Sequence, residues 1–183
     1  MIGTTLSHFR ITEKLGEGGM GEVWLAEDVR LGRKVALKIL PPDRAEREDR
    51  LRRFEDEARA ASTLNHPGIA HIYDVGEADG IHFIAMERVD GESLDQRMAR
   101  SPMTTAEIVD LGARLADALS AAHGQGVTHR DIKPSNLMLT AEGRLKVLDF
   151  GLAKLRRPLG EGGGEGTAQT VTQPGMVMGT VQF

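Results

Sequence analysis

The segment Gly16–Val23, "GEGGMGEV", contains four glycines. It constrains the possible folds of this chain more than any other segment does. Residues that favour β-strands stand on both sides of it, in the runs 8–15 and 21–29. Glycine clusters occur where a backbone must bend sharply or approach another group closely. The pattern predicts a β-hairpin with a glycine-rich tip. An ordinary β-domain could carry such a hairpin, whereas the dinucleotide-binding fingerprint differs because its glycines lead into a helix.

Further strands and a helix are expected in the first half of the chain. Residues 34–40 favour a strand after a turn around Gly32, and residues 69–89 favour two strands around the turn-forming pair Asp79-Gly80. Between them, residues 43–65 are charged and predict a helix. Its apolar face consists of residues at helical spacing, Leu51, Phe54, Ala58 and Ala61.

The second half begins with a different pattern. Residues 104–123 predict a long amphipathic helix that starts with a capping box of Thr104 and Glu107 and stops at the glycines that follow it. Two short strands are expected within 136–150. The chain is therefore expected to be α+β, with a complete small β-rich part followed by part of a helical one.

These patterns divide the chain into four segments. Residues 1–8 form an N-terminal segment, 9–89 a small β-rich lobe and 90–153 a partial helical lobe. Residues 154–183 are rich in Gly, Thr and Gln without periodicity and are expected to be mobile.

Composition excludes several classes of protein. The 183 residues include 23 Lys and Arg against 27 Asp and Glu, and this net negative charge argues against general nucleic-acid binding. The chain has no cysteine, which excludes disulfides and thiolate metal sites and is compatible with a reducing compartment. No secretory signal and no membrane segment is expected in this chain, so a cytoplasmic location is expected.

Three short segments carry candidate chemistry. In "VALK", Val35–Lys38, strand alternation places Ala36 and Lys38 on one face, where a small apolar residue beside an ammonium group suits adenine next to phosphates; a solvated strand lysine is the alternative. The segments "HRDIKPSN", residues 129–136, and "DFG", residues 149–151, bring together two aspartates, a lysine and an asparagine. Asp and Asn oxygens suit Mg²⁺, and a further Asp near a hydroxyl can accept its proton.

With these motifs in this order, the chain resembles the eukaryotic-like (Hanks-type) protein kinases, most closely the bacterial serine/threonine branch. The resemblance covers essentially the whole chain. It implies a protein-kinase-like fold and transfer of the ATP γ-phosphate, with Mg²⁺, to Ser or Thr hydroxyls of a protein substrate. The alternative is a non-catalytic ATP-binding or protein-interaction module derived from a kinase.

The resemblance implies which residues contact the phosphates. The glycine loop over them would be formed by Gly16, Gly18 and Gly21. Lys38 would hold the α- and β-phosphates, and its partner on the first helix would be Glu57, with Glu55 as the rival.

The resemblance also implies an adenine pocket. Met86 would lie at its back, and the backbone of Glu87 and Val89 would hydrogen-bond the adenine edge. The residues expected to sandwich the ring are Val23, Ala36 and Met138, with Leu148 nearby; for each of them plain core packing is the alternative.

In the catalytic loop, the resemblance makes Asp131 the group that orients the attacking hydroxyl and accepts its proton. Lys133 would neutralise the γ-phosphate, and Asn136 and Asp149 would hold Mg²⁺. Arg130 would pair with a phosphate on an activation-segment threonine. The candidates are Thr167, Thr170 and Thr172, whereas Thr180 matches a structural threonine of the family.

The family's kinase domain continues beyond the point that matches Phe183. The chain is therefore expected to be a fragment that ends within the activation segment, with the helix at 104–123 exposing an apolar face. The partners implied are ATP, a protein substrate, and a second kinase copy for autophosphorylation.

Overall fold

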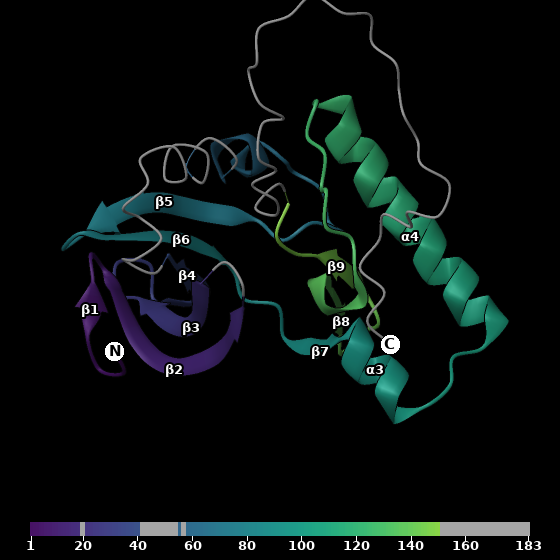
Figure 1. Ribbon diagram of the computed structural model, residues 1–183, viewed down its shortest axis with the longest axis horizontal. Helices are drawn as coiled ribbons and strands as arrows, with labels where there is room; N and C mark the ends of the chain where they lie inside the picture. Colours follow the sequence, from purple (N-terminus) through teal and green to yellow (C-terminus); the bar gives the residue numbers. More distant parts are fainter. Residues whose placement is uncertain (19–20, 41–54, 56–57, 151–183) are drawn as a thin grey trace, which may run out of the picture.

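The computed structural model describes residues 1–18, 21–40, 55 and 58–150. A curled six-stranded antiparallel sheet forms one side of the molecule, and a smaller sheet with two helices forms the other (Figure 1). The α+β expectation is thus confirmed. In spatial order the strands of the large sheet are β1 (Thr5–Leu6), β2 (Phe9–Gly18), β3 (Gly21–Asp28), β4 (Arg33–Ile39), β6 (Ile81–Glu87) and β5 (Ile72–Ala78).

The turns of this sheet follow from their residue types. Asp79 and Gly80 both have positive φ angles, 51° and 73°, as the tightest hairpin connections require. Gly32, with a φ of 64°, lies in the turn between β3 and β4. The buried carboxylate of Asp28 accepts hydrogen bonds from the backbone N–H groups of Arg30 and Leu31, each at 3.1 Å, and so closes this turn.

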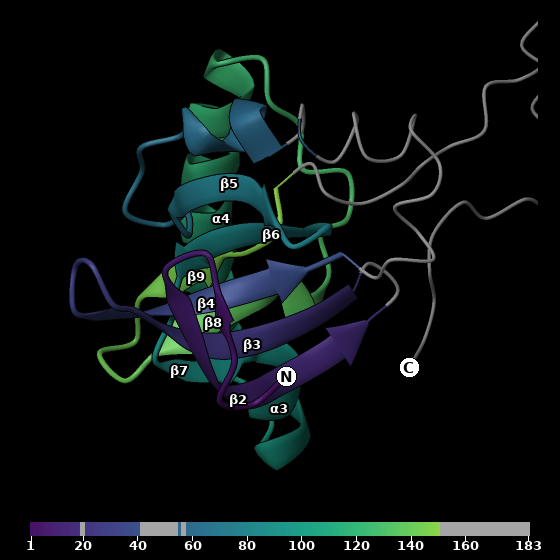
Figure 2. The same ribbon diagram turned by 90° about the vertical axis from the view of Figure 1, so that its left-hand side faces the viewer.

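The two faces of the sheet bury different residues. On one face, Phe9 and Phe83 meet edge to face, with ring centroids 5.5 Å apart, at the centre of an apolar core. On the other face, Ile84 packs with Ala58, which belongs to a helical stretch at 58–62 that lies beside β5 (Figure 2). Ala58 and Ala61 are buried as expected, whereas Leu51 and Phe54 lie outside the described residues.

The smaller part contains a three-stranded sheet and two helices. Helix α4 (Thr105–Gly124) begins with the capping box of Thr104 and Glu107, so the predicted long helix is confirmed. The sequence analysis missed the strand β7 (Gly91–Ser93) and the helix α3 (Leu94–Arg100). The other elements of this part are the 3₁₀ turn η1 (Pro134–Asn136), β8 (Leu137–Thr140) and β9 (Leu145–Val147).

One face of α4 packs on β8 and β9, and another carries exposed apolar side chains. Ala118 and Ala122 are buried against Val147, whereas Ile108 and Val109 are 56% and 66% exposed. A largely apolar hollow of about 410 Å³ lies between α3 and α4. The exposed apolar face expected for this helix is therefore confirmed. Within the described residues, no helix combines the length and apolar character needed to cross a bilayer.

Gly91 is predicted to be irreplaceable where β7 meets β8, because a Cβ there would overlap the carbonyl oxygen of Leu139. We expect Gly91→Ala to lower the free energy of unfolding by at least about 1–3 kcal/mol, as overpacking does. The matched control is Gly112→Ala in α4, where a Cβ meets nothing within 4 Å. This change should raise stability by up to about 1 kcal/mol. Urea unfolding of both variants tests the pair, and equal effects would contradict the prediction.

Candidate active site

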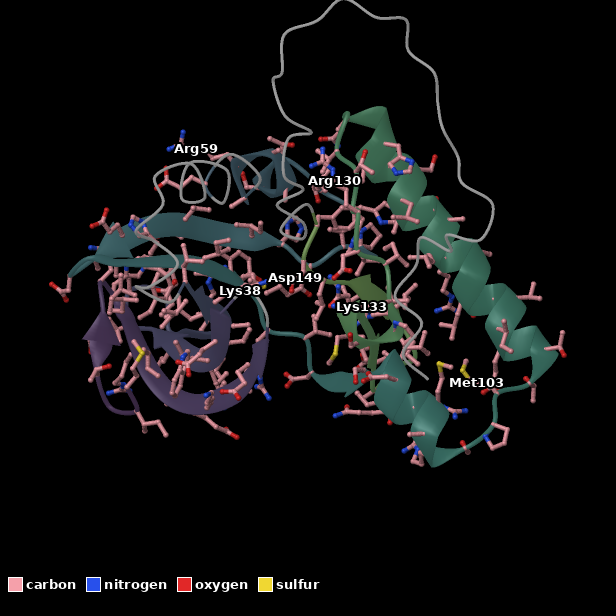
Figure 3. The ribbon with its side chains drawn as sticks, viewed as in Figure 1. Lys38, Arg59, Met103, Arg130, Lys133 and Asp149 are labelled. Atoms are coloured by element: carbon pink, nitrogen blue, oxygen red, sulfur yellow. The ribbon has the colours of Figure 1, made fainter. Side chains whose placement is uncertain are left out.

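Lys38 and Asp149 form an ion pair where the two parts of the molecule meet (Figure 3). The alternation of β4 puts Lys38 on the face that also carries Ala36, as predicted, and leaves it only 3% exposed. Its Nζ lies 2.8 Å from Oδ2 of Asp149, which follows β9 with a φ of 55°. A buried ammonium group must be paired, and this pair joins residues 111 positions apart in the sequence.

The catalytic-loop residues converge on Asp131. Nδ2 of Asn136 donates to the Asp131 backbone oxygen at 2.9 Å and to its Oδ2 at 3.3 Å. Nζ of Lys133 lies 2.9 Å from the same Oδ2. Backbone N–H of Leu148 donates to the carbonyl of Asn136 at 2.9 Å, which ties the loop to the segment that leads to Asp149. The structure therefore brings together Asp131, Lys133 and Asn136, which the sequence analysis singled out, and links their loop to the segment before Asp149.

The buried ring of His129 connects the same two segments. It is 1% exposed, and its Nδ1 accepts a hydrogen bond from the backbone N–H of Asp131 at 3.2 Å. The ring proton therefore sits on Nε2, which donates to the carbonyl of Leu148 at 2.7 Å. The ring also meets Phe150 edge to face, with centroids 4.8 Å apart. The motif contains His129, but nothing in the sequence indicates these contacts.

The residues expected around adenine share one face of the large sheet. Ala36 pairs with Met86 across β4 and β6, and Val23 packs against the same small cluster. Met138 lies in β8, on the opposite side of the junction. Val89 follows the end of β6.

Glu87, at the end of β6, is held through its side chain by Lys146 of β9. Nζ of Lys146 lies 2.8 Å from each carboxylate oxygen of Glu87 and 3.4 Å from the carbonyl of Ile69. The same carboxylate accepts from the backbone N–H of His71 at 3.1 Å, and the Glu87 N–H donates back to the His71 carbonyl at 2.7 Å. Sequence reasoning missed Lys146, because no local pattern links it to Glu87.

The glycine-rich hairpin is formed by β2 and β3, as predicted. Gly16 pairs with Val23 and Gly18 with Gly21, while residues 19–20 lie outside the described part. A Cβ added at Gly16 would meet nothing within 4 Å. Gly21 has a φ of 131°, a conformation that favours glycine.

Several expected site residues lie outside the described part of the chain. They are Glu57, Thr167, Thr170, Thr172 and Thr180. The rival Glu55 is described, and its carboxylate lies 3.8 Å from Nδ1 of His82 and 3.9 Å from Arg59. Arg130, just before Asp131, has a φ of 67°.

Burial lowers the pKa of His129 below the ordinary value for histidine, although the carbonyl of Leu148 opposes the shift. Protonation at Nδ1 would also break the bond from the Asp131 N–H. We therefore expect the NMR signal of this ring to titrate below about pH 6.5. The resulting contribution to stability is complete above about pH 6.5, the ordinary value, and is lost as the pH falls from there through the lower pKa of the folded protein. A midpoint at or above the ordinary value would contradict this assignment.

Comparisons with known proteins agree with this geometry. The protein kinase domain family matches residues 9–173. The chain is 39% identical to serine/threonine-protein kinase PknA of Mycobacterium tuberculosis, over 100% of this chain and 42% of that protein. It is 38% identical to serine/threonine-protein kinase PrkC of Bacillus subtilis, over 100% of this chain and 27% of that protein.

Solved structures show the same similarity. The PknI kinase domain of Mycobacterium tuberculosis superposes with a TM-score of 0.75 at 38% identity, over 84% of this chain and 62% of that one. The chain thus spans less than two thirds of these relatives. The match over residues 9–173 nevertheless includes the ion pair and the catalytic loop described above. The chain therefore belongs to the protein kinase domain family, as a Hanks-type serine/threonine member of its bacterial branch.

Proposed function

We propose that this chain is the catalytic part of a protein serine/threonine kinase, which transfers the γ-phosphate of ATP to Ser or Thr hydroxyls of a protein substrate. The observation that carries the proposal is the buried ion pair of Lys38 with Asp149 beside the loop that holds Asp131 and Asn136. The similar proteins PknA and PrkC are named serine/threonine-protein kinases, which supports the same chemistry here.

The residues at this junction fit the nucleotide and metal that the family uses, ATP and Mg²⁺. Asn136 and Asp149 offer the hard oxygen donors that Mg²⁺ prefers. The two residues are held near each other because the backbone N–H of Leu148, the neighbour of Asp149, donates to the carbonyl of Asn136. Bound Mg²⁺ would neutralise phosphate charge. Lys38 adds a buried positive charge on the same face as Ala36 and would hold the α- and β-phosphates. Gly16, Gly18 and Gly21 would cover these phosphates.

Asp131 is the group that would orient the attacking hydroxyl and accept its proton. Its carboxylate is already positioned by Asn136 and Lys133, so little reorganisation is needed when a substrate arrives. Lys133 lies beside that carboxylate, where its charge would also neutralise the γ-phosphate. Glu57, expected on the first helix, would be the partner of Lys38 when ATP and Mg²⁺ are bound.

The adenine ring would lie between the two parts of the molecule. Its edge would bond to the backbone of Glu87 and Val89, with Met86 at the back of the pocket. The pairing of Ala36 with Met86, and the support that Lys146 gives Glu87, favour this placement. Val23 and Met138, from opposite sides of the junction, would sandwich the ring together with Ala36 and the neighbouring Leu148.

The proposal includes the organisation and setting of the chain. The lobes would be 9–89 and 90–153, preceded by the segment 1–8 and followed by an activation segment that starts at 154. A cytoplasmic location fits the absence of cysteine and the supply of ATP. A second copy of the kinase would be the partner for autophosphorylation.

Two matched substitutions test whether Asp149 and Asp131 have different roles. We expect Asp149→Asn to reduce the Mg²⁺-dependent gain in ATP affinity by at least about tenfold, the scale of changes around bound metals. Asp131→Asn should retain that gain, because Asp131 acts on the hydroxyl. Calorimetric titration of the 183-residue chain with ATP, with and without Mg²⁺, measures both variants.

Equal loss of the Mg²⁺ effect in both variants would contradict the assigned roles. In a version that continues through the whole kinase domain, Asp131→Asn should slow phosphate transfer by at least about 10²-fold. A wild-type version that binds MgATP but transfers nothing would instead support the non-catalytic module.

The activation segment supplies the acceptor for the proposed autophosphorylation. In the same whole-domain version, we expect phosphate on the threonines at 167–172. Arg130, which precedes the catalytic Asp131, could pair with such a phosphate. Phosphopeptide mapping checks this, with the Asp131→Asn version as the control. Modification found only outside 154–183 would count against it.

A further inference from the structure

The carboxylate of Glu87, at the end of β6, is held by two other segments of the chain. Nζ of Lys146 in β9 lies 2.8 Å from each of its oxygens, and the two side chains are only 14% and 22% exposed. Lys146 also donates to the carbonyl of Ile69 at 3.4 Å. From the segment before β5, the backbone N–H of His71 donates to Oε2 of Glu87 at 3.1 Å. The position of this carboxylate is therefore set by groups outside β6.

The bond from His71 replaces a regular bond of the sheet. Continuing the register of Ile72 with Met86, His71 stands opposite Glu87, and the Glu87 N–H donates to the His71 carbonyl at 2.7 Å. In a regular antiparallel pair of this kind, the His71 N–H would donate back to the Glu87 carbonyl. Here that N–H donates to the Glu87 carboxylate. The side chain of Glu87 thus takes a hydrogen bond that its own backbone carbonyl would otherwise accept.

This exchange decides what the backbone of Glu87 can offer a ligand. Its N–H is committed to His71, whereas its carbonyl oxygen is relieved of the return bond and keeps its capacity to accept. The backbone of Glu87 therefore offers an acceptor and no donor. A purine with an amino group at position 6 supplies the matching donor, while a purine without that group does not.

Lys146 and His71 are fixed relative to each other by the backbone of their neighbours. The N–H of Val147 donates to the carbonyl of Gly68 at 2.8 Å, and the N–H of Ala70 donates to the carbonyl of Val147 at 3.0 Å. The ammonium group of Lys146 is thus attached to the same short segment that presents the His71 N–H. Together they place the Glu87 carboxylate on that N–H.

We propose that Lys146 is a positioning residue for the base of the nucleotide and acts through the carboxylate of Glu87. By holding that carboxylate on the His71 N–H, Lys146 keeps the Glu87 carbonyl available to the 6-amino group of adenine. This step rests on the proposed function, which places the adenine edge against Glu87. Without Lys146 the carboxylate loses its fixed position, and the His71 N–H returns to the carbonyl. The site then loses its preference for a 6-amino purine.

The first test compares the Kd of ATP with that of purine riboside triphosphate, which lacks only the 6-amino group, both with Mg²⁺. The 183-residue chain should bind ATP about three- to tenfold more tightly, the range of one uncharged hydrogen bond. Lys146→Met should remove this difference. Both nucleotides carry the same phosphates, so a purely structural or electrostatic role of Lys146 would weaken them alike and leave the ratio of the two Kd values unchanged.

The matched control is Arg144→Met. Arg144 is a cation two residues before Lys146, and it pairs with Glu142 at 3.2 Å. This variant should keep the wild-type ratio. If Lys146→Met fails to fold because Glu87 has lost its cation, the double variant Lys146→Met/Glu87→Met removes both charges and decides the outcome. It should also bind the two nucleotides equally.

A second measurement does not depend on nucleotide. NMR scalar couplings across hydrogen bonds identify the acceptor of each amide. In wild type, the amide nitrogen of His71 should couple to the side-chain carboxyl carbon of Glu87, and in the double variant to the Glu87 backbone carbonyl. The coupling from the Glu87 amide to the His71 carbonyl should persist in both and is the internal control. A coupling from His71 to the Glu87 backbone carbonyl in wild type overturns the proposal.

The outcomes separate this proposal from the proposed function. A wild-type chain that binds both nucleotides equally overturns the positioning role and leaves ATP binding standing. Equal ratios in wild type and Lys146→Met overturn the role of Lys146 alone. If the chain binds neither nucleotide, the proposed function fails and the positioning role fails with it, while the couplings still decide whether the carboxylate replaces the carbonyl.

Discussion

The candidate site depends on a single buried charge, the ammonium group of Lys38. Breaking a buried ion pair by removing one partner typically costs about 3–5 kcal/mol, so the fold must keep a carboxylate within reach. Asp149 provides it at 2.8 Å, with a side chain several times more exposed than that of Lys38. In the proposed function Asp149 would hold Mg²⁺ and Lys38 would contact the phosphates, so the accessible carboxylate could leave the ammonium group without leaving that group unpaired.

Asp149 is placed by backbone contacts that run through a buried histidine. His129 accepts from the Asp131 N–H and donates to the Leu148 carbonyl, and the Leu148 N–H donates to the Asn136 carbonyl. These bonds fix the spacing between the loop that carries Asp131 and the segment that carries Asp149. The neutral tautomer of His129 is thus part of the geometry of the site, which is why burial of this ring matters for function as well as stability.

Local signals predicted local structure. Asp79 and Gly80 indicated their hairpin, and Thr104 and Glu107 indicated the start of α4, because each acts through neighbours in the sequence. The motif around Asp131 and Asn136 indicated a shared site only because a resemblance supplied the long-range pairing. The helix α3 was missed, although Ser93 and Gln96 form a capping box at its start. The contacts of His82 and Lys146 could not be predicted, because their partners are set by strand register and by the junction of two sheets.

Two ion pairs cross the junction in opposite directions. Lys38 of the large sheet meets Asp149 of the smaller part, and Lys146 of the smaller part meets Glu87 of the large sheet. Backbone hydrogen bonds of Val147 with Gly68 and Ala70 lie between these pairs. The Glu87 pair and the backbone bonds do not involve Lys38, so they would hold the two parts together if the carboxylate of Asp149 left the ammonium group. The junction would therefore allow Lys38 to change its partner without separating the two parts, as the proposed binding and release of a charged nucleotide requires.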